Sequence, residues 1–261
     1  MAEPKDGIQS LQRGLRALEF AIERDVRPAE LAAILQVGRT TALRFLQTLE
    51  SAGYLQQSPS TKTFRANPAK IFLLASRLAS SLNWLATAEP FISELAQATG
   101  ETANLAVLEG ADVVYVAVAH SPMELSVRPL IGTKRPIHSS AIGKAIIAFL
   151  DEPLRDDLLA VAELSPLTWR TITSPEVLKN HLAEVRARGY AIDDQESVAG
   201  VRCIAAPLLD RNQRPFAAIG ISAPLVRLTD DRVSALCMLV RQTADRLSSS
   251  LWNERPVLQR E

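Results

Sequence analysis

The sequence predicts an α+β protein of two domains: a small helical domain that ends in a hairpin, then a larger domain of mixed strands and helices. Three observations lead to this prediction. The chain has 261 residues, enough for two separate cores. Apolar residues are spaced as in helices up to residue 52, whereas strand-like runs begin after residue 101. Residues 1–80 contain eleven Lys or Arg and seven Asp or Glu, although the formal net charge of the chain is zero.

The composition excludes several classes of protein. Hydrophobic residues make up 47% of the chain and charged residues 22%, as in an ordinary globular protein. No apolar run approaches the roughly 20 residues that cross a bilayer, and the first residues do not resemble a signal peptide. We therefore expect a cytoplasmic protein that does not contact membranes. Cys203 and Cys237 are the only cysteines, so we expect no disulfide framework, no structural metal and no cofactor.

Three helices are predicted in quick succession. The first has Ser10 as a possible cap, and its apolar positions repeat with the helical period at Leu11, Leu15, Leu18 and Ile22. The second begins at Pro28, where the missing amide hydrogen costs nothing, and packs Leu31, Ile34 and Leu35. A tight turn at Val37 and Gly38 follows, because Gly tolerates the positive φ that ends a helix.

The third helix is predicted from about Arg39 to Ala52, and it has two unlike faces. Its apolar face holds Ala42, Phe45, Leu46 and Leu49. The opposite face presents Thr40, Leu43, Arg44 and Gln47, with Thr41 at the flank. Gly53 leads into an extended segment, a turn with the sequence SPSTK and a returning strand, which together form a wing with Lys62 near its tip.

A helix pair joined by a Gly turn and followed by a basic hairpin is typical of a winged helix-turn-helix. Guanidinium and hydroxyl groups on the outer face of the third helix can bond to phosphates and to base edges in a major groove. We therefore predict binding to double-stranded operator DNA. A merely solvated face, or a module that docks a protein instead of DNA, remains an alternative. The predicted DNA contacts are Arg13, Arg39, Thr40, Thr41, Leu43, Arg44, Gln47, Lys62 and Arg65.

These residues also carry a resemblance to a known family. The chain resembles the winged helix-turn-helix of IclR-type bacterial transcription regulators in SLQRGLRALEFA, RPAELAAILQVGRTTALRFLQTLESAGYL and FRANPAKIFLLA. The resemblance continues through ETANLAVLEGADVVYVA, RPIHSSAIGKAIIAFL and GYAIDDQESVAGVRCIAAPLLD, from about Gln9 to Leu251. Its most specific pattern is met by Gly189, Asp193, Glu196, Cys203, Ile204, Ala205, Leu208 and Asp210, with Leu209 where an aromatic residue is usual.

The resemblance implies the organisation of the chain. An apolar helix over Ala69 to Leu85 would join the domains, and the N-terminal domains would pair in a homo-oligomer, either a dimer or a dimer of dimers. We expect a DNA-binding domain at 1–68, a linker helix at 69–86, an effector-binding and oligomerising domain at 87–252 and a tail at 253–261.

The elements of the second domain follow from its apolar patterns. Helices are predicted at Phe91–Thr99, Ser140–Leu150, Pro153–Glu163, Pro175–Arg188 and Asp230–Leu251. Strands are predicted at Thr102–Glu109, Asp112–Ala119, Leu125–Leu130, Ala191–Asp193, Val201–Leu209 and Phe216–Ala223. The resemblance implies a GAF-like fold for this domain, an antiparallel sheet flanked by helices.

Catalysis is not expected. Cys203, His138, Asp193, Asp194 and Glu196 are residue types that nucleophilic chemistry uses. Cys203, however, lies in VRCIAAPLL, a run typical of a buried strand, where a thiol is usually inert. The sequence has no G-x-S-x-G elbow and no phosphate loop. An enzyme that uses Cys203 remains the alternative.

A ligand pocket is the favoured interpretation of the second domain. The segment IGTKRPIHSSAIGKA offers Lys134, Arg135, two serine hydroxyls and the amides of a helix start, which suit a carboxylate, although a cap and a solvated loop would look the same. The resemblance implies that a small organic acid binds here, lined by Val127, Arg135, Ala141, Ile142, Asp193, Val201, Cys203, Gly220 and Ser222. Arg135 replaces an apolar residue of the aligned family member, which favours an anion with an apolar, for example aromatic, body. We predict a transcriptional regulator, repressor or activator, whose operator affinity this effector controls.

Overall fold

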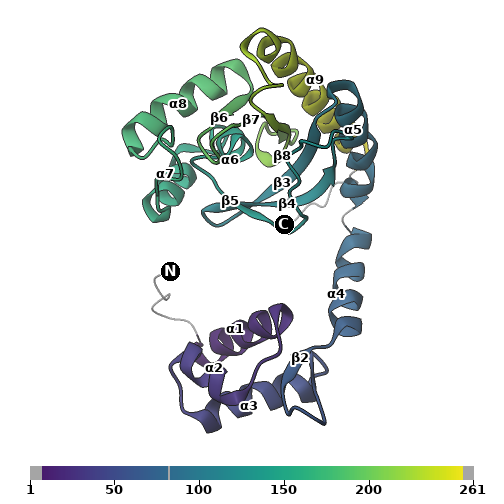
Figure 1. Cartoon of the computed structure of the whole chain (residues 1–261), viewed down its shortest axis with the longest axis vertical. Helices are drawn as coiled ribbons and strands as arrows, with labels where there is room; N and C mark the ends of the chain where they lie inside the picture. The colour runs from purple at the N-terminus through teal and green to yellow at the C-terminus, as the bar shows by residue number, and fades with distance from the viewer. Residues whose placement is uncertain (1–7, 82, 255–261) are drawn as a thin grey trace. The chain divides into compact units, whose positions relative to one another are not determined.

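The computed structural model describes residues 8–81 and 83–254, and most of its elements are labelled in Figure 1. The chain divides into two compact units, Met1–Leu82 and Asn83–Glu261, each with cores of its own. The predicted α+β class is confirmed. Residue 82 of the predicted linker and residues 255–261 of the predicted tail lie outside the described residues.

The first unit contains the three expected helices and the expected hairpin. Helices α1 (Gln9–Glu23), α2 (Pro28–Leu35) and α3 (Arg39–Ser51) precede the antiparallel strands β1 (Leu55–Gln57) and β2 (Phe64–Ala66). Their shared core comprises Ala17, Ala21, Val26, Leu31, Leu35, Ala42, Leu46, Leu55 and Phe64. A further bridge joins Val26 to Phe64, so the strand that follows the hairpin turn is held from both sides. The winged helix-turn-helix is therefore a compact body of its own.

The apolar stripe of α1 lies on the expected helix, but most of it faces away from the core. Helix α1 buries Ala17 and Ala21, whereas Leu11, Leu15 and Ile22 are 59%, 53% and 52% exposed. The small alanines allow close packing against the other helices, Leu18 packs against the same core, and the rest of the stripe faces outward. The N-cap of α1 is Ile8 and not Ser10, and no side chain caps it.

The turn between α2 and α3 also differs from the expectation. Gln36 adopts the left-handed conformation with φ of 53°, and its amide donates to the carbonyl oxygens of Ala32 and Ala33. Gly38 has an ordinary φ of −63° and is the N-cap of α3. Helix α2 ends early enough that residue 36, and not Gly38, falls at the left-handed position that terminates a helix.

Helices α4 (Pro68–Ser81) and α5 (Asn83–Thr99) stand where a linker helix to residue 85 and a separate helix from Phe91 were expected. Helix α5 runs through Pro90, which was expected to precede its first turn. A proline inside a helix loses one hydrogen bond and costs about 3 kcal/mol. Burial of Ala88, Ile92 and Leu95 on both sides of Pro90 offsets that loss.

The second unit is built on a six-stranded antiparallel sheet with the order β5-β4-β3-β8-β7-β6. Its strands are β3 (Thr102–Glu109), β4 (Asp112–Ala119), β5 (Lys134–Pro136), β6 (Ala191–Asp194), β7 (Val201–Leu209) and β8 (Pro215–Pro224). The register places Cys203 between Asp193 on one side and Ser222 on the other. This pairing brings three distant parts of the sequence together at one edge of the unit.

The strand expected at Leu125–Leu130 does not form. That part of the chain has no regular secondary structure, and β5 takes the place beside β4 instead. Side chains, and not a strand ladder, hold its main chain: Thr102 Oγ1 donates to the Val127 carbonyl oxygen at 2.7 Å, and Arg227 Nη1 donates to the Leu125 carbonyl oxygen at 2.6 Å. Arg227 is itself fixed by two hydrogen bonds to the Glu101 carboxylate, at 2.7 and 2.6 Å.

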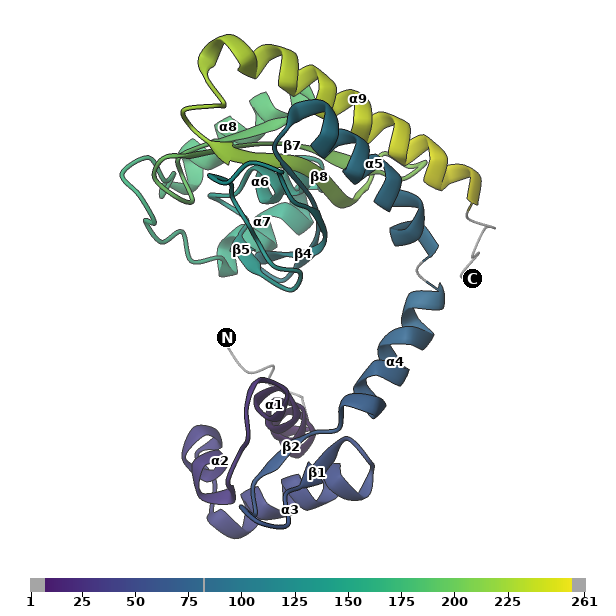
Figure 2. The same cartoon turned by 45° about the vertical axis from the view of Figure 1, so that its right-hand side comes forward.

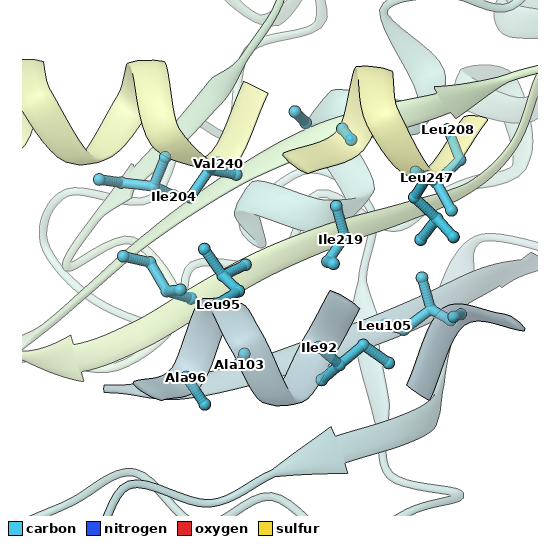
Figure 3. Close-up of a cluster of buried hydrophobic side chains, with 14 of the residues drawn as sticks. Ile92, Leu95, Ala96, Ala103, Leu105, Ile204, Leu208, Ile219, Val240 and Leu247 are labelled. Atoms are coloured by element: carbon cyan, nitrogen blue, oxygen red, sulfur yellow. The ribbon is translucent and has the colours of Figure 1, made fainter. Parts of the chain in front are cut away.

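Helices cover both faces of the sheet. Figure 2 shows α5 and α9 (Asp230–Glu254) lying side by side on one face. The other face is covered by α6 (Ala141–Ile147), α7 (Glu152–Val161) and α8 (Pro175–Arg188). Alternate residues of a strand enter the two cores, as Leu105 and Ala106 do. In the first core, Figure 3 shows Ile92 and Leu95 of α5 facing Ile219 of the sheet, with Val240 and Leu247 of α9 nearby.

This arrangement agrees with the expected antiparallel sheet flanked by helices. Among the described residues, the helices lack the combination of length and apolar content that a bilayer crossing requires.

Candidate DNA-recognition face and effector cavity

Helix α3 presents the polar face that the sequence predicts. Arg39, Thr40, Thr41, Arg44 and Gln47 are exposed. Leu43 is half-buried, and Ala42 and Leu46 are buried in the core of the first unit. Since the N-cap is a glycine, no side chain bonds to the first amides of α3. Those amides therefore remain available to a phosphate oxygen.

The hairpin after α3 carries two further cations. Lys62 is exposed at the turn and has a φ of 56°, and its amide donates to the Ser58 carbonyl oxygen at 3.0 Å. Arg65 is exposed on β2, with its Nε 3.6 Å from Asp25 Oδ1. Arg13 lies on α1, away from the hairpin in sequence, and is half-buried. The structure thus gives α3 and the hairpin an accessible cationic surface, while Asp25 offsets part of the Arg65 charge.

The second unit contains a cavity of about 390 Å³ beside the β6–β7 side of its sheet. Its walls come from all six strands of the sheet, from the start of α6, from the connection after β6 and from residues 125–129. Eight of the nine residues predicted to bind an effector line it: Val127, Arg135, Ala141, Ile142, Asp193, Val201, Cys203 and Ser222.

Gly220 is the predicted residue that does not line this cavity. It lies in β8 opposite Ala205 of β7. A Cβ at this position would stand 2.4 Å from the Ile204 carbonyl oxygen and 2.9 Å from the Ala205 Cβ. The structure therefore explains the glycine by the close approach of two strands.

Polar groups gather at the sheet side of the cavity. Asn104 Nδ2 donates to Ser222 Oγ at 3.0 Å. Burial raises the pKa of the Tyr115 phenol, with a smaller contribution from Cys203 and an opposing one from the Arg135 guanidinium. Burial and the neighbouring Asp193 raise the pKa of the Cys203 thiol. Both groups are therefore protonated and neutral near pH 7, and Cys203 does not have the properties of a nucleophile.

Asp193 is held by the main chain of the connection that follows it. Its Oδ1 accepts hydrogen bonds from the amides of Glu196 and Ser197, at 2.6 and 3.2 Å. Burial raises the pKa of the Asp193 carboxyl, and Lys144 and the two amides oppose that rise. Arg135 is half-buried in the same wall and supplies a permanent positive charge.

Other groups of the predicted carboxylate site serve the fold. Lys134 is exposed and pairs with Glu109 at 2.7 Å. Ser140 caps α6, since its Oγ accepts from the Gly143 amide at 3.1 Å and donates to the Pro136 carbonyl oxygen at 2.8 Å. Ser139 is fully buried against Ser197, with 3.2 Å between their hydroxyl oxygens. Of the two adjacent cations, only Arg135 lines the cavity.

The structure adds lining residues that sequence reasoning missed. Asn104 and Tyr115 come from β3 and β4, and Arg128, whose Nε donates to Ser126 Oγ at 3.1 Å, comes from the irregular segment 125–129. Strand alternation shows that residues 104 and 115 face one side of the sheet, but not that a cavity lies there. The run SVRPLIGTKRP contains Arg128 as well as Arg135, and that additional arginine was the available clue.

The residues considered for catalysis are engaged elsewhere. His138 Nε2 lies 3.1 Å from the Ser165 carbonyl oxygen. Asp194 pairs with Arg170 and Arg202, and Glu196 pairs with Lys144. Within residues 8–81 and 83–254, no group of three or more His, Cys, Asp or Glu side chains could hold a metal ion.

Comparison with known proteins assigns a family domain to each of the two units. Residues 10–59 match the IclR helix-turn-helix domain, and residues 76–249 match the bacterial transcriptional regulator IclR C-terminal domain. The transcriptional repressor IclR of Escherichia coli K12 is 37% identical over 241 residues, which cover 91% of this chain and 88% of that protein. The regulator KdgR of the same strain is 31% identical, over 94% of both chains.

Solved structures show the same fold. The transcriptional regulator RHA06195 from Rhodococcus sp. RHA1 is 31% identical, with a TM-score of 0.77 over 95% of this chain and 100% of that one. An IclR homolog from Microbacterium hydrocarbonoxydans, solved with 4-hydroxybenzoate, is 22% identical, with a TM-score of 0.79 over 94% of this chain and 100% of that one. The relatives are named as regulators and not as enzymes. The chain belongs to the IclR family of bacterial transcriptional regulators, and it is a DNA-binding regulator of transcription.

Proposed function

We propose that this regulator binds a two-fold operator through α3 and the hairpin of two paired copies, and that a small carboxylate in the cavity controls its operator affinity. In this proposal residues 1–68 bind DNA, residues 69–86 connect, and residues 87–252 bind the effector and associate. Because its partner is chromosomal DNA, we place the protein in the cytoplasm.

The observation that carries the effector proposal is Arg135 in the wall of a cavity that also has apolar side chains and a second cation, Arg128. A guanidinium forms strong paired hydrogen bonds with a carboxylate. Val127, Ile142 and Val201 add apolar surface that a two-carbon acid would leave uncovered. The 4-hydroxybenzoate in the Microbacterium homolog is a carboxylate with an aromatic body, in agreement with this chemistry.

Calorimetric titration with a panel of carboxylates and their neutral amides tests the proposal. We expect carboxylates to bind and Arg135→Met to weaken them by roughly tenfold or more, since a charge-assisted bond contributes about 1.5–3 kcal/mol. Lys134→Met is the matched control, because Lys134 is the adjacent cation but pairs with Glu109 outside the cavity lining. Equal binding of acids and amides, or full binding by Arg135→Met, would contradict the role of Arg135.

The exposed side of α1 supports pairing of the N-terminal units. Ile8, Leu11, Leu15 and Ile22 are exposed, and their spacing of three, four and seven residues is that of a coiled-coil seam. Phe72, Leu73 and Leu74 of α4 are exposed as well. Single exposed leucines are common, but a continuous apolar stripe indicates a partner, and a second α1 matches its spacing.

Effector binding then acts by changing how well two paired α3 helices reach their half-sites. A coupling free energy of about 1–3 kcal/mol changes operator affinity by roughly 5- to 150-fold. The E. coli relative is named a repressor, which favours repression; activation is the second possibility. Footprinting upstream of the gene's own coding sequence, with and without added acid, tests the direction of the effect.

A further inference from the structure

The end of β6 and its connection to β7, together residues 194–200, form one wall of the cavity. Ser197, Val198 and Gly200 line the cavity from this connection, together with Asp193 just before it. The connection has no regular secondary structure, and Gln195 adopts a positive φ of 66°. A residue other than glycine holds that conformation only when its surroundings enforce it. The wall therefore depends on contacts from outside the cavity.

The main contact from outside comes from Lys144 of α6. Its side chain is 0% exposed, and its Nζ donates to the Ile192 carbonyl oxygen at 2.7 Å and forms an ion pair with the Glu196 carboxylate. Lys144 does not line the cavity. One buried ammonium group thus bonds both to β6 and to the connection that follows it.

Further bonds restrain the same residues. Thr168 Oγ1 donates to the Gln195 carbonyl oxygen at 2.7 Å, and Thr171 Oγ1 donates to the Glu196 carbonyl oxygen at 2.7 Å. The Glu196 amide donates to Asp193 in the cavity wall, while its carboxylate turns to Lys144. Glu196 therefore connects the Lys144 ammonium group to the cavity wall, through its carboxylate on one side and its amide on the other.

A buried ion pair is a poor means of gaining stability, because desolvation of both charges opposes their attraction. Apolar side chains would suit the surroundings, since α6 also buries Ile142, Ala145, Ile146 and Ile147. An ion pair holds its two partners in one fixed geometry. Apolar contacts do not impose such a geometry.

We propose that Lys144 is a positioning residue for the effector cavity: through Glu196 it holds residues 194–200 in the conformation that presents Asp193, Ser197 and Val198 to the ligand. The ligand part of this inference rests on the proposed effector function. The positioning part concerns the chain without any ligand, so it can be tested separately.

The test compares two variants of the full-length protein by hydrogen exchange. Lys144→Met with Glu196→Leu removes both charges and the tether, whereas Glu196→Gln keeps a carbonyl oxygen that Lys144 can donate to. We expect amide exchange over residues 194–200 to rise roughly tenfold or more in the double variant and to stay near the wild-type rate in Glu196→Gln. Residues 204–208 of β7 serve as the internal reference and should not change, and the thermal midpoint of the double variant should match the wild type.

Unchanged exchange over residues 194–200 in the double variant would overturn the proposal, as would an equal rise in Glu196→Gln. If the double variant does not fold, Glu196→Leu alone removes the tether and leaves a lysine that can lose its proton, and the same criteria apply. Titration with 4-hydroxybenzoate adds the ligand arm: if residues 194–200 keep the binding conformation only about a tenth of the time, affinity falls about tenfold. If neither 4-hydroxybenzoate nor the panel binds the wild type, the effector proposal fails, and the exchange rates still decide the positioning.

Discussion

Arg44→Ala is the most direct test of how this regulator reads DNA. Arg44 is exposed on α3 and makes no ion pair among the described residues, and Thr48 Oγ1 donates a hydrogen bond to its carbonyl oxygen at 2.8 Å. The substitution keeps that bond and places a strong helix former in an exposed helix. Stability should therefore change by no more than about 0.5 kcal/mol.

The expected loss in DNA binding follows from the free guanidinium. A two-pronged contact to a guanine is worth about 1–3 kcal/mol, so affinity for the operator should fall roughly 5- to 150-fold. A shuffled duplex should lose much less, because only one cation is removed. Arg65→Ala should instead weaken both duplexes alike and reduce the salt slope by less than about 0.9, because Asp25 at 3.6 Å already offsets part of its charge.

Fluorescence anisotropy at several salt concentrations measures these effects, with an operator selected from random duplexes and a shuffled version of it. Lys179→Ala, an exposed cation on α8 that pairs with Asp156, is the control for net charge. Equal losses on both duplexes would show that Arg44 contacts only phosphates. No loss on either duplex would refute the assignment of this face of α3 to DNA.

Three further predictions concern stability and assembly. Gly220→Ala should destabilise the second unit by about 1–3 kcal/mol, because its Cβ would stand 2.4 Å from the Ile204 carbonyl oxygen. Gly14→Ala should stabilise the first unit by about 0.5–1 kcal/mol, because Gly14 lies inside α1 and an added Cβ meets open space. Calorimetry on the two variants measures both changes. Burial, assisted by Lys144 and Arg188, lowers the pKa of His181 from 6.5 to about 4. A folded-state pKa below the unfolded one gives stability that is complete above pH 6.5 and lost as the pH falls toward 4. Between pH 7 and 5 the loss should be about 1 kcal/mol after allowance for partial exposure, and urea unfolding of His181→Leu should show a smaller loss. Leu15→Glu should halve the mass found by light scattering if α1 pairs two copies, and an unchanged mass would place the contact elsewhere.

Long periodic runs bounded by turn residues were predictable to the residue. Strands β3, β4 and β7 and helix α8 have the expected limits. In each, the apolar period and the turn residues that flank it agree, so local preference and tertiary packing favour the same limits.

Features that depend on partners were not predictable in this way. The leucine stripe of α1 predicts a helix but not which face of it packs on the core. In the structure the face with Ala17 and Ala21 is buried. Pro90 predicted a helix start, but packing on the sheet carries α5 through it. The strand expected over residues 125–130 does not form, and hydrogen bonds from the side chains of Thr102 and Arg227 hold that main chain instead. Such long-range contacts leave no local pattern.

The cavity shows the same limit. Family resemblance located eight of its lining residues, whereas Asn104, Tyr115 and Arg128 required the strand register and the path of an irregular segment. The role of Gly220 depends on how closely β7 and β8 approach, which no local spacing encodes.

The anchors of residues 125–129 have a consequence for how such regulators diversify. Thr102 and Arg227 donate hydrogen bonds to main-chain carbonyl oxygens, which every amino acid carries. These bonds do not constrain the side chains of Leu125, Val127 and Arg128. Under the proposed function, replacement of these three side chains changes which acid the cavity accepts and leaves the two anchoring hydrogen bonds in place. A change in the specificity of the proposed effector cavity then requires only a few substitutions, all of them within residues 125–129.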